Sequence, residues 1–191
     1  IGYLTGNIME KFELLQASKK LSQIDDASKA LQYKAFVPAF ATELQRASEH
    51  EYPVALALLS VAAFRKYIET YGIDAAHALL AEIVGLVKEE IRDMDILARF
   101  GADEFILCLS GMTQSEAQAK LGAIKDHVAG KAIGQADFAI DLTIGALSLG
   151  HPESRKHRVQ DIIGALGRAL VDAKDAKTAT VVVKAIEEQE G

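Results

Sequence analysis

The stretch RDMDILARFGADEFILCLSG, residues 92–111, decides the fold of this chain. Two short apolar runs, DILARF (95–100) and EFILCLS (104–110), are separated by Gly, Ala and Asp. Apolar runs rich in β-favouring residues on either side of such a turn predict a β-hairpin. The acidic pair Asp103 and Glu104 stands at the turn, where paired carboxylates can bind a metal ion or move a proton.

Helical and strand-like segments flank this hairpin on both sides. Upstream, the apolar run YPVALALLSV (52–61) predicts a fully buried strand. Helical spacing of apolar residues predicts helices at 29–49, 63–71, 74–92, 113–129 and 160–175, and two further strands are expected at 138–150 and 178–184. Pro38 either kinks the first of these helices or moves its start. The order predicts an α/β fold, an α+β sandwich with one sheet covered by helices.

Residues 1–24 carry apolar side chains at intervals typical of an amphipathic helix. Two interpretations are open: the helix packs on its own domain, or it is a signalling linker that pairs with a second copy. We expect an N-terminal helix at 1–24, one domain at 25–185 and a short tail at 186–191. Because the chain does not begin with methionine, we expect it to be a piece of a longer protein, which can be membrane-anchored.

Composition narrows the class of protein. Half of the 191 residues are apolar and a quarter are charged, which is ordinary for a soluble globular domain. The formal charge of −6 argues against nucleic acid as a partner. The longest apolar run, 54–64, is too short to span a bilayer, so no direct membrane contact is expected. The single cysteine, Cys108, cannot form an internal disulfide and favours a reducing, cytoplasmic location.

The order of elements together with RFGADEF (99–105) resembles the GGDEF domain of bacterial diguanylate cyclases, with Ala102 in place of the second glycine. The resemblance covers roughly residues 25–185. It implies a nucleotide-cyclase-like, mostly antiparallel sheet flanked by helices. It also implies that active members condense two GTP molecules into cyclic di-GMP, with metal ions held by carboxylates at the hairpin and at the end of the first strand.

Several positions depart from the family pattern. The motif Asp-x-Asp-x-Phe-Lys at the strand end reads SVAAFR, so Ser60 and Ala62 replace both aspartates. The positions that hold guanine in the family correspond to Ile68 and His77, whereas Lys174 matches a phosphate-contacting lysine. From these departures we expect a chain that is not an enzyme, with Asp103 and Glu104 vestigial, no metal site and no catalytic cofactor.

The tetrapeptide RDMD, Arg92 to Asp95, has the pattern and spacing of the family's inhibitory motif, which binds cyclic di-GMP. A guanidinium can donate two hydrogen bonds to the O6 and N7 edge of guanine, and a carboxylate can accept from its N1–H. Lys125 or Lys120 can add a further positive charge. The alternative for Arg92 and Asp95 is a solvated ion pair at a helix end, since RVQD (158–161) repeats the pattern with no expected role.

The resemblance favours a catalytically inactive cyclic di-GMP receptor that regulates a partner, for example in exopolysaccharide synthesis, as receptors of the PelD class do. A homodimer mate or a protein partner would then bind through the N-terminal helix. One alternative is a dimerisation or docking module that needs no nucleotide. A weaker alternative is a residual diguanylate cyclase that uses Asp103 and Glu104.

Overall fold

The computed structural model describes residues 23–135, 137–149, 159–175 and 181–185. In this part of the chain six strands form one sheet in the order β1-β3-β4-β2-β5-β6. The strands are β1 (Leu31–Gln32), β2 (Val54–Val61), β3 (Ile96–Arg99), β4 (Glu104–Ser110), β5 (Leu142–Leu149) and β6 (Val181–Ala185). The three central pairings are antiparallel and the two outer ones are parallel. The predicted mostly antiparallel sheet is therefore confirmed.

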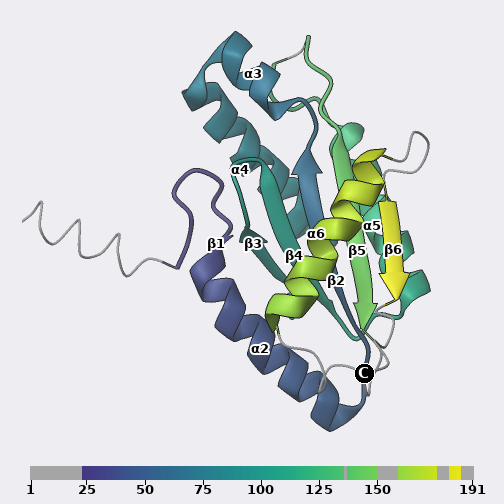
Figure 1. Cartoon of the computed structure of the whole chain (residues 1–191). Helices are drawn as coiled ribbons and strands as arrows, with labels where there is room; N and C mark the ends of the chain where they lie inside the picture. The colour runs from purple at the N-terminus through teal and green to yellow at the C-terminus, as the bar shows by residue number, and fades with distance from the viewer. Residues whose placement is uncertain (1–22, 136, 150–158, 176–180, 186–191) are drawn as a thin grey trace, which may run out of the picture.

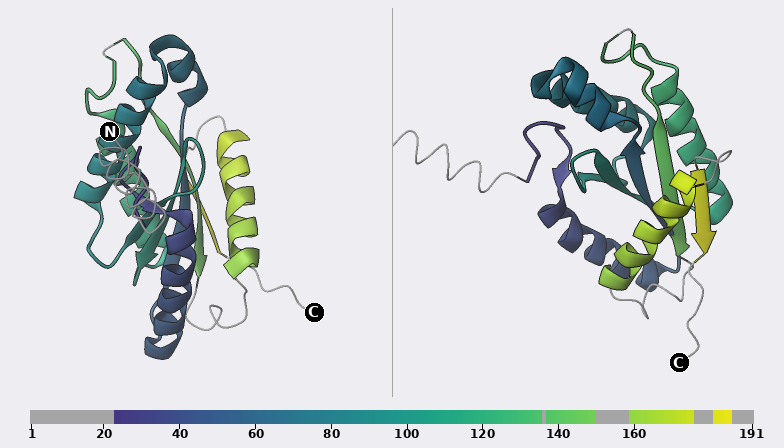
Figure 2. Two further views of the ribbon diagram at one scale, coloured as in Figure 1. Left: turned by 90° about the vertical axis from the view of Figure 1, so that its left-hand side faces the viewer. Right: turned by 45° about the horizontal axis from the view of Figure 1, so that its top comes forward.

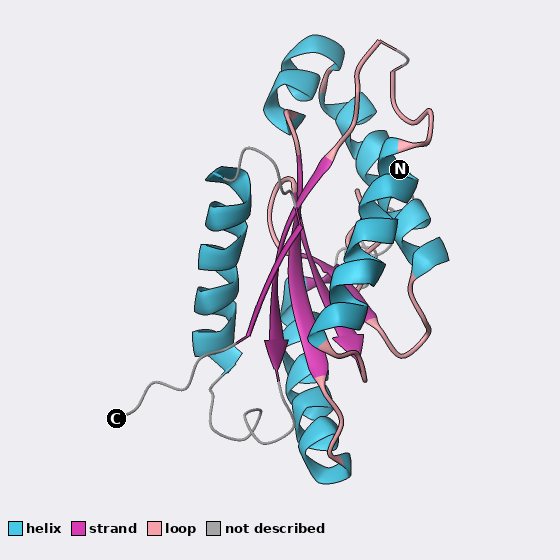
Figure 3. Cartoon of the chain, turned by 90° about the vertical axis from the view of Figure 1, so that its right-hand side faces the viewer, coloured by secondary structure: helices cyan, strands magenta, loops and turns pink. Residues whose placement is uncertain are grey.

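Helices cover both faces of the sheet (Figures 1, 2 and 3). They are α2 (Tyr33–His50), α3 (Phe64–Tyr71), α4 (Ile73–Glu90), α5 (Gln114–Ala129) and α6 (Val159–Asp175). Side chains of α2 and α6 share one hydrophobic core with Leu58 and Ile106. Side chains of α3, α4 and α5 share the other core with Leu59 and Phe105. Because successive strand residues point to opposite faces, the central strands fill both cores and are almost wholly apolar.

Two elements begin four residues later than the sequence predicts, α2 at Tyr33 instead of 29 and β5 at Leu142 instead of 138. The first predicted helix starts only at Tyr33, because Leu31 and Gln32 pair in parallel with β3. It then continues through Pro38. The strand predicted at 138–150 begins only at Leu142, because Phe138 packs edge-on against the ring of Tyr67 instead of joining the sheet. Residues 1–22 of the predicted N-terminal helix lie outside the described residues. Among the described helices, none has the length and apolar character needed to cross a membrane.

Gly145 on β5 sets the distance between the sheet and α6. A Cβ atom placed on Gly145 would lie 2.3 Å from the backbone nitrogen of Leu170 and 2.5 Å from the carbonyl carbon of Ala169. No side chain fits in that space, so glycine at this position allows the α6 backbone to lie directly on β5. The close contact fixes which residues of α6 reach the ends of the strands.

We expect Gly145→Ala to lower the free energy of unfolding by about 1–3 kcal/mol, because the added methyl group must push α6 away from the sheet. Gly164→Ala on α6 is the matched control, since a Cβ there meets no atom within 4 Å. That change should leave stability unchanged or raise it by up to about 1 kcal/mol. Denaturant unfolding monitored by circular dichroism measures both effects. Equal stability of the two variants would contradict this account of the packing.

Candidate functional site

The turn between α4 and β3 contains the tetrapeptide Arg92 to Asp95. The Asp95 amide donates to the Arg92 carbonyl at 2.9 Å, and the Asp95 Oδ2 atom accepts from the Arg92 amide, also at 2.9 Å. A short carboxylate side chain that closes a turn in this way is a common use of aspartate. The aspartate thus fixes the path of the chain from the end of α4 into β3.

The carboxylate of Asp95 is fully buried, with a side-chain exposure of 0 %. Its Oδ1 atom accepts from Arg92 Nη2 and from the Ser110 amide, each at 3.0 Å. Its Oδ2 atom accepts from Arg92 Nε at 3.2 Å as well as from the Arg92 amide. Four donors fill the acceptor positions of one carboxylate and compensate the cost of burying its charge.

Arg92 is clamped on one side and open on the other. Its side chain is 45 % exposed, while Nη2 also donates to the Ser110 carbonyl. Hydrogen bonding to Asp95 raises the pKa of the Arg92 guanidinium above its usual value, so the group stays charged. The neighbouring side chain of Asp93 is exposed and takes no part in this network. The turn therefore presents one orientated, permanently positive guanidinium to solvent.

Ser110, the last residue of β4, belongs to this site and was not predicted from the sequence. Its amide binds Asp95 and its carbonyl binds Arg92. Its hydroxyl is the one buried side-chain polar atom in the described part of the chain that lacks a hydrogen-bond partner. The pairing of Ile96 with Cys108 carries Ser110 level with the turn. A predicted hairpin register could have identified this residue.

Lys120 lies close to the turn. Its Nζ atom donates to the carbonyl of Glu90 at 2.8 Å and lies 3.7 Å from the Glu90 carboxylate. Glu90 is the last residue of α4, two positions before Arg92. The structure therefore brings this predicted cation to the same end of the sheet as Arg92, although an acidic neighbour partly neutralises it.

Lys125 lies at the opposite end of the sheet. It pairs with Asp141 and donates to the Leu142 carbonyl at 2.9 Å. Leu142 and Ser110 pair with opposite ends of β2, seven residue steps apart. At about 3.3 Å per residue this is roughly 23 Å along the strand. The structure does not bring Lys125 together with Arg92.

The acidic pair of the hairpin is also at this opposite end. Glu104 pairs across the sheet with Ser60, which is buried. Glu104 Oε1 lies 3.2 Å from the ammonium group of Lys174 on α6. The carbonyl of Asp103 accepts from the Val61 amide at 3.0 Å. In the described part of the chain, no group of three or more His, Cys, Asp or Glu side chains is arranged to hold a metal ion.

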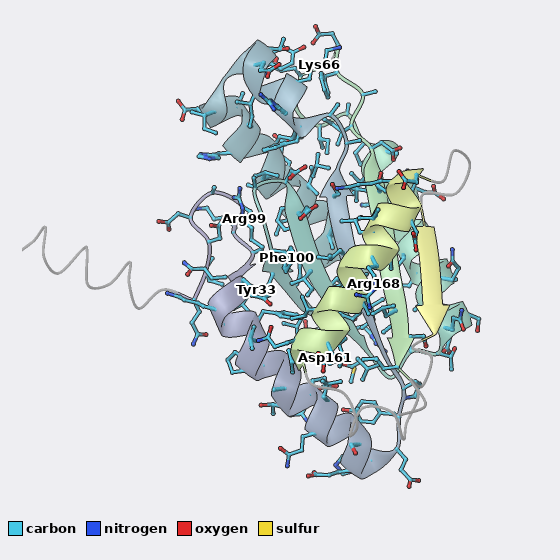
Figure 4. The ribbon with its side chains drawn as sticks, viewed as in Figure 1. Tyr33, Lys66, Arg99, Phe100, Asp161 and Arg168 are labelled. Atoms are coloured by element: carbon cyan, nitrogen blue, oxygen red, sulfur yellow. The ribbon has the colours of Figure 1, made fainter. Side chains whose placement is uncertain are left out.

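Arg99 holds the turn of the hairpin in place (Figure 4). Its Nε atom donates to the Gly101 carbonyl at 3.0 Å and Nη2 donates to the Ala102 carbonyl at 2.7 Å. Its Nη1 atom donates to Asp25 Oδ1 at 2.9 Å, which ties the turn to the segment that precedes β1. One guanidinium thus fixes the backbone that positions Asp103 and Glu104.

The sheet, its helices and the acidic hairpin define a nucleotide-cyclase-like domain. The sequence model of the family described as "Diguanylate cyclase, GGDEF domain" matches residues 22–180, and this chain belongs to that family. Diguanylate cyclase DosC of Escherichia coli (strain K12) is 26 % identical over 150 residues, which cover 76 % of this chain and 32 % of DosC. The chain therefore spans about a third of the length of the curated relatives it matches.

Solved structures show the same fold. The GGDEF domain of DgcB from Caulobacter crescentus, in complex with c-di-GMP, has a TM-score of 0.76 at 17 % identity, covering 85 % of this chain and 95 % of that domain. The active GGEEF domain of a diguanylate cyclase from Vibrio cholerae has a TM-score of 0.71 at 21 % identity, covering 83 % of this chain and 98 % of that one. At these identities the likeness establishes the α/β GGDEF fold.

The expectation that the chain is not an enzyme is wrong in the light of these relatives. The family is that of diguanylate cyclases, the curated relative DosC is named as one, and a structural relative is described as active. The presence of Ser60 and Ala62 where the family pattern has two aspartates does not by itself show that the chain lacks activity. Magnesium often keeps several waters and needs only one or two protein carboxylates beside substrate phosphates, and Asp103 and Glu104 remain at the hairpin.

We expect Asp95→Ala to lower the free energy of unfolding by about 2–3 kcal/mol, because it leaves the buried Ser110 amide without its acceptor. Asp93→Ala, two positions earlier on the exposed side of the same turn, is the matched control and should change stability by less than about 0.5 kcal/mol. Urea unfolding of both variants measures the difference. A small effect of Asp95→Ala would show that the network does not hold the turn.

Proposed function

We propose that this domain is a cyclic di-GMP receptor with its binding site centred on Arg92. The observation that carries the proposal is the clamp on this side chain: Asp95 is fully buried and binds the guanidinium twice, while 45 % of Arg92 stays exposed. A solvated surface arginine pays rotamer entropy when it binds a ligand. The Asp95 carboxylate already holds Arg92 in one conformation. Most of the side-chain entropy is therefore lost when the domain folds, and little more is lost when a ligand binds.

The chemistry of the ligand suits one fixed guanidinium. Arginine can donate two parallel hydrogen bonds to O6 and N7 of a guanine and can stack on a base. In the described conformation the oxygens of Asp95 are engaged by four donors, so Asp95 positions Arg92. A guanine N1–H reaches Asp95 only by competing with one of those donors. Lys120, beside the end of α4, adds positive charge for the phosphates.

Family membership supports the same ligand. The GGDEF domain of DgcB, which shares this fold, was solved in complex with c-di-GMP. In a receptor, the bound ligand changes how the domain contacts a partner protein or a second copy of itself. The segment before β1 suits this output, because Asp25 in that segment is tied to the rest of the domain through Arg99.

Calorimetric titration with cyclic di-GMP tests the proposal. We expect binding by the wild-type domain, and a loss of affinity of about tenfold or more in Arg92→Ala, because a bidentate contact to guanine contributes about 1–3 kcal/mol. Arg92→Lys should also bind weakly, since it keeps the charge but lacks the planar fork.

Arg158→Ala is the matched control, since Arg158 begins the second Arg-x-x-Asp tetrapeptide of the chain. It should bind like the wild type. Thermal unfolding of each variant verifies that it is folded. The absence of heat at high micromolar ligand, or unchanged affinity in Arg92→Ala, would refute the receptor function.

Diguanylate cyclase activity is the second candidate, favoured by the family and by the name of the relative DosC. It predicts that the protein converts GTP and magnesium into cyclic di-GMP, measured by chromatography. Glu104→Gln should then lose most of the product, because it removes a carboxylate of the hairpin, whereas Glu49→Gln on the exposed side of α2 should not. Equal or absent product formation in all three proteins would contradict this candidate.

A further inference from the structure

A row of polar side chains crosses the sheet at the end that carries Glu104. Ser60 of β2 pairs with Glu104 of β4 on one side and with Thr143 of β5 on the other. Leu58 lies two positions before Ser60 and Ile106 two positions after Glu104, and both belong to the core shared with α2 and α6. Because side chains alternate between faces, the polar row lies on the same face as that core.

The last turn of α6 delivers a cation to this row. The α6 backbone lies directly on β5 where Leu170 meets Gly145. Lys174 follows Leu170 by one helical turn, and Thr143 precedes Gly145 by two strand residues. Both steps cover about 5–7 Å. The Lys174 ammonium accordingly reaches Glu104 Oε1 at 3.2 Å.

Without a bound nucleotide, the residues at this level offer a divalent metal ion few anionic ligands. Magnesium and manganese ions bind best to several hard, mostly anionic oxygens. Here Glu104 supplies one carboxylate, and its neighbour Asp103 lies in the turn just outside the paired row. Ser60 and Thr143 supply neutral hydroxyls, and Ala62 supplies no ligand. The carboxylate already carries an ammonium counter-charge, and the described residues contain no cluster of three candidate metal ligands.

We propose that the Lys174 ammonium takes the place of a divalent cation at Glu104 and competes with such ions for that carboxylate. A second cation at the same oxygens meets the repulsion of the ammonium group and must displace it. The pair is only partly buried, with side-chain exposures of 43 % for Lys174 and 25 % for Glu104, so displacement is feasible. An anionic ligand that attracts Lys174 would therefore free Glu104.

Manganese binding tests the inference directly. Electron paramagnetic resonance measures free Mn²⁺ as it is titrated against the protein without nucleotide, so the result does not depend on cyclic di-GMP binding at Arg92. We expect weak binding by the wild type and about two- to fivefold tighter binding by Lys174→Met, the scale of an exposed ion pair. In Lys174→Met/Glu104→Gln the gain should disappear.

Lys88→Met is the control for net charge, because Lys88 donates to a backbone carbonyl and its removal uncovers no carboxylate. A second pair of variants tests the ligand set. In the Lys174→Met background, Ser60→Asp should bind Mn²⁺ at least about tenfold more tightly than Ser60→Asn, which has the same shape without the charge.

Three results would overturn the inference: wild-type affinity equal to that of Lys174→Met, an equal gain in Lys88→Met, or a gain that survives Glu104→Gln. The Lys174 and Lys88 variants change partly exposed side chains and should remain folded, which circular dichroism verifies. Mn²⁺ binding by these variants therefore tests the competition between Lys174 and the metal ion even if the buried substitutions at Ser60 unfold the domain.

Discussion

The buried carboxylate of Asp95 is the interaction on which the candidate site depends. It joins the end of α4, the start of β3 and the last residue of β4 through bonds to Arg92 and Ser110. A buried charge with any of these donors missing would be costly, so the three segments must meet in one arrangement. Arg92 is ordered as a consequence, and the proposed binding surface rests on the same network that stabilises the turn.

Much of the fold follows from local patterns. The hairpin at 95–110, the buried strand β2 and the five helices come from runs whose apolar spacing indicates the type of element, although not always where it begins. β1 could not be predicted, because two residues have no periodicity of their own and form a strand only where β3 is beside them. The late start of β5 has the same origin, since Phe138 packs on Tyr67 instead of joining the sheet.

The candidate site was only partly predictable for a related reason. Arg92 and Asp95 were identified through family resemblance and spacing, and the structure places them in direct contact. Ser110 was missed because it contributes through its backbone, which leaves no signature in residue type. Lys120 and Lys125 could not be told apart, since only the tertiary fold shows that one lies beside α4 and the other beside β5.

The carboxylates at the two ends of the sheet differ in burial: Asp95 is fully buried, whereas Glu104 is partly exposed. Asp95 has no exposed side-chain surface and holds four donors, so no outside cation can bind it without breaking the turn. Glu104 keeps a quarter of its surface exposed and faces one ammonium group on a helix end. Such a pair exchanges at little cost, because solvent screens both charges. The guanidinium of Arg92 is thus fixed by buried Asp95, whereas the ammonium of Lys174 at Glu104 can be replaced. The difference lies in the burial of the two carboxylates rather than in residue type.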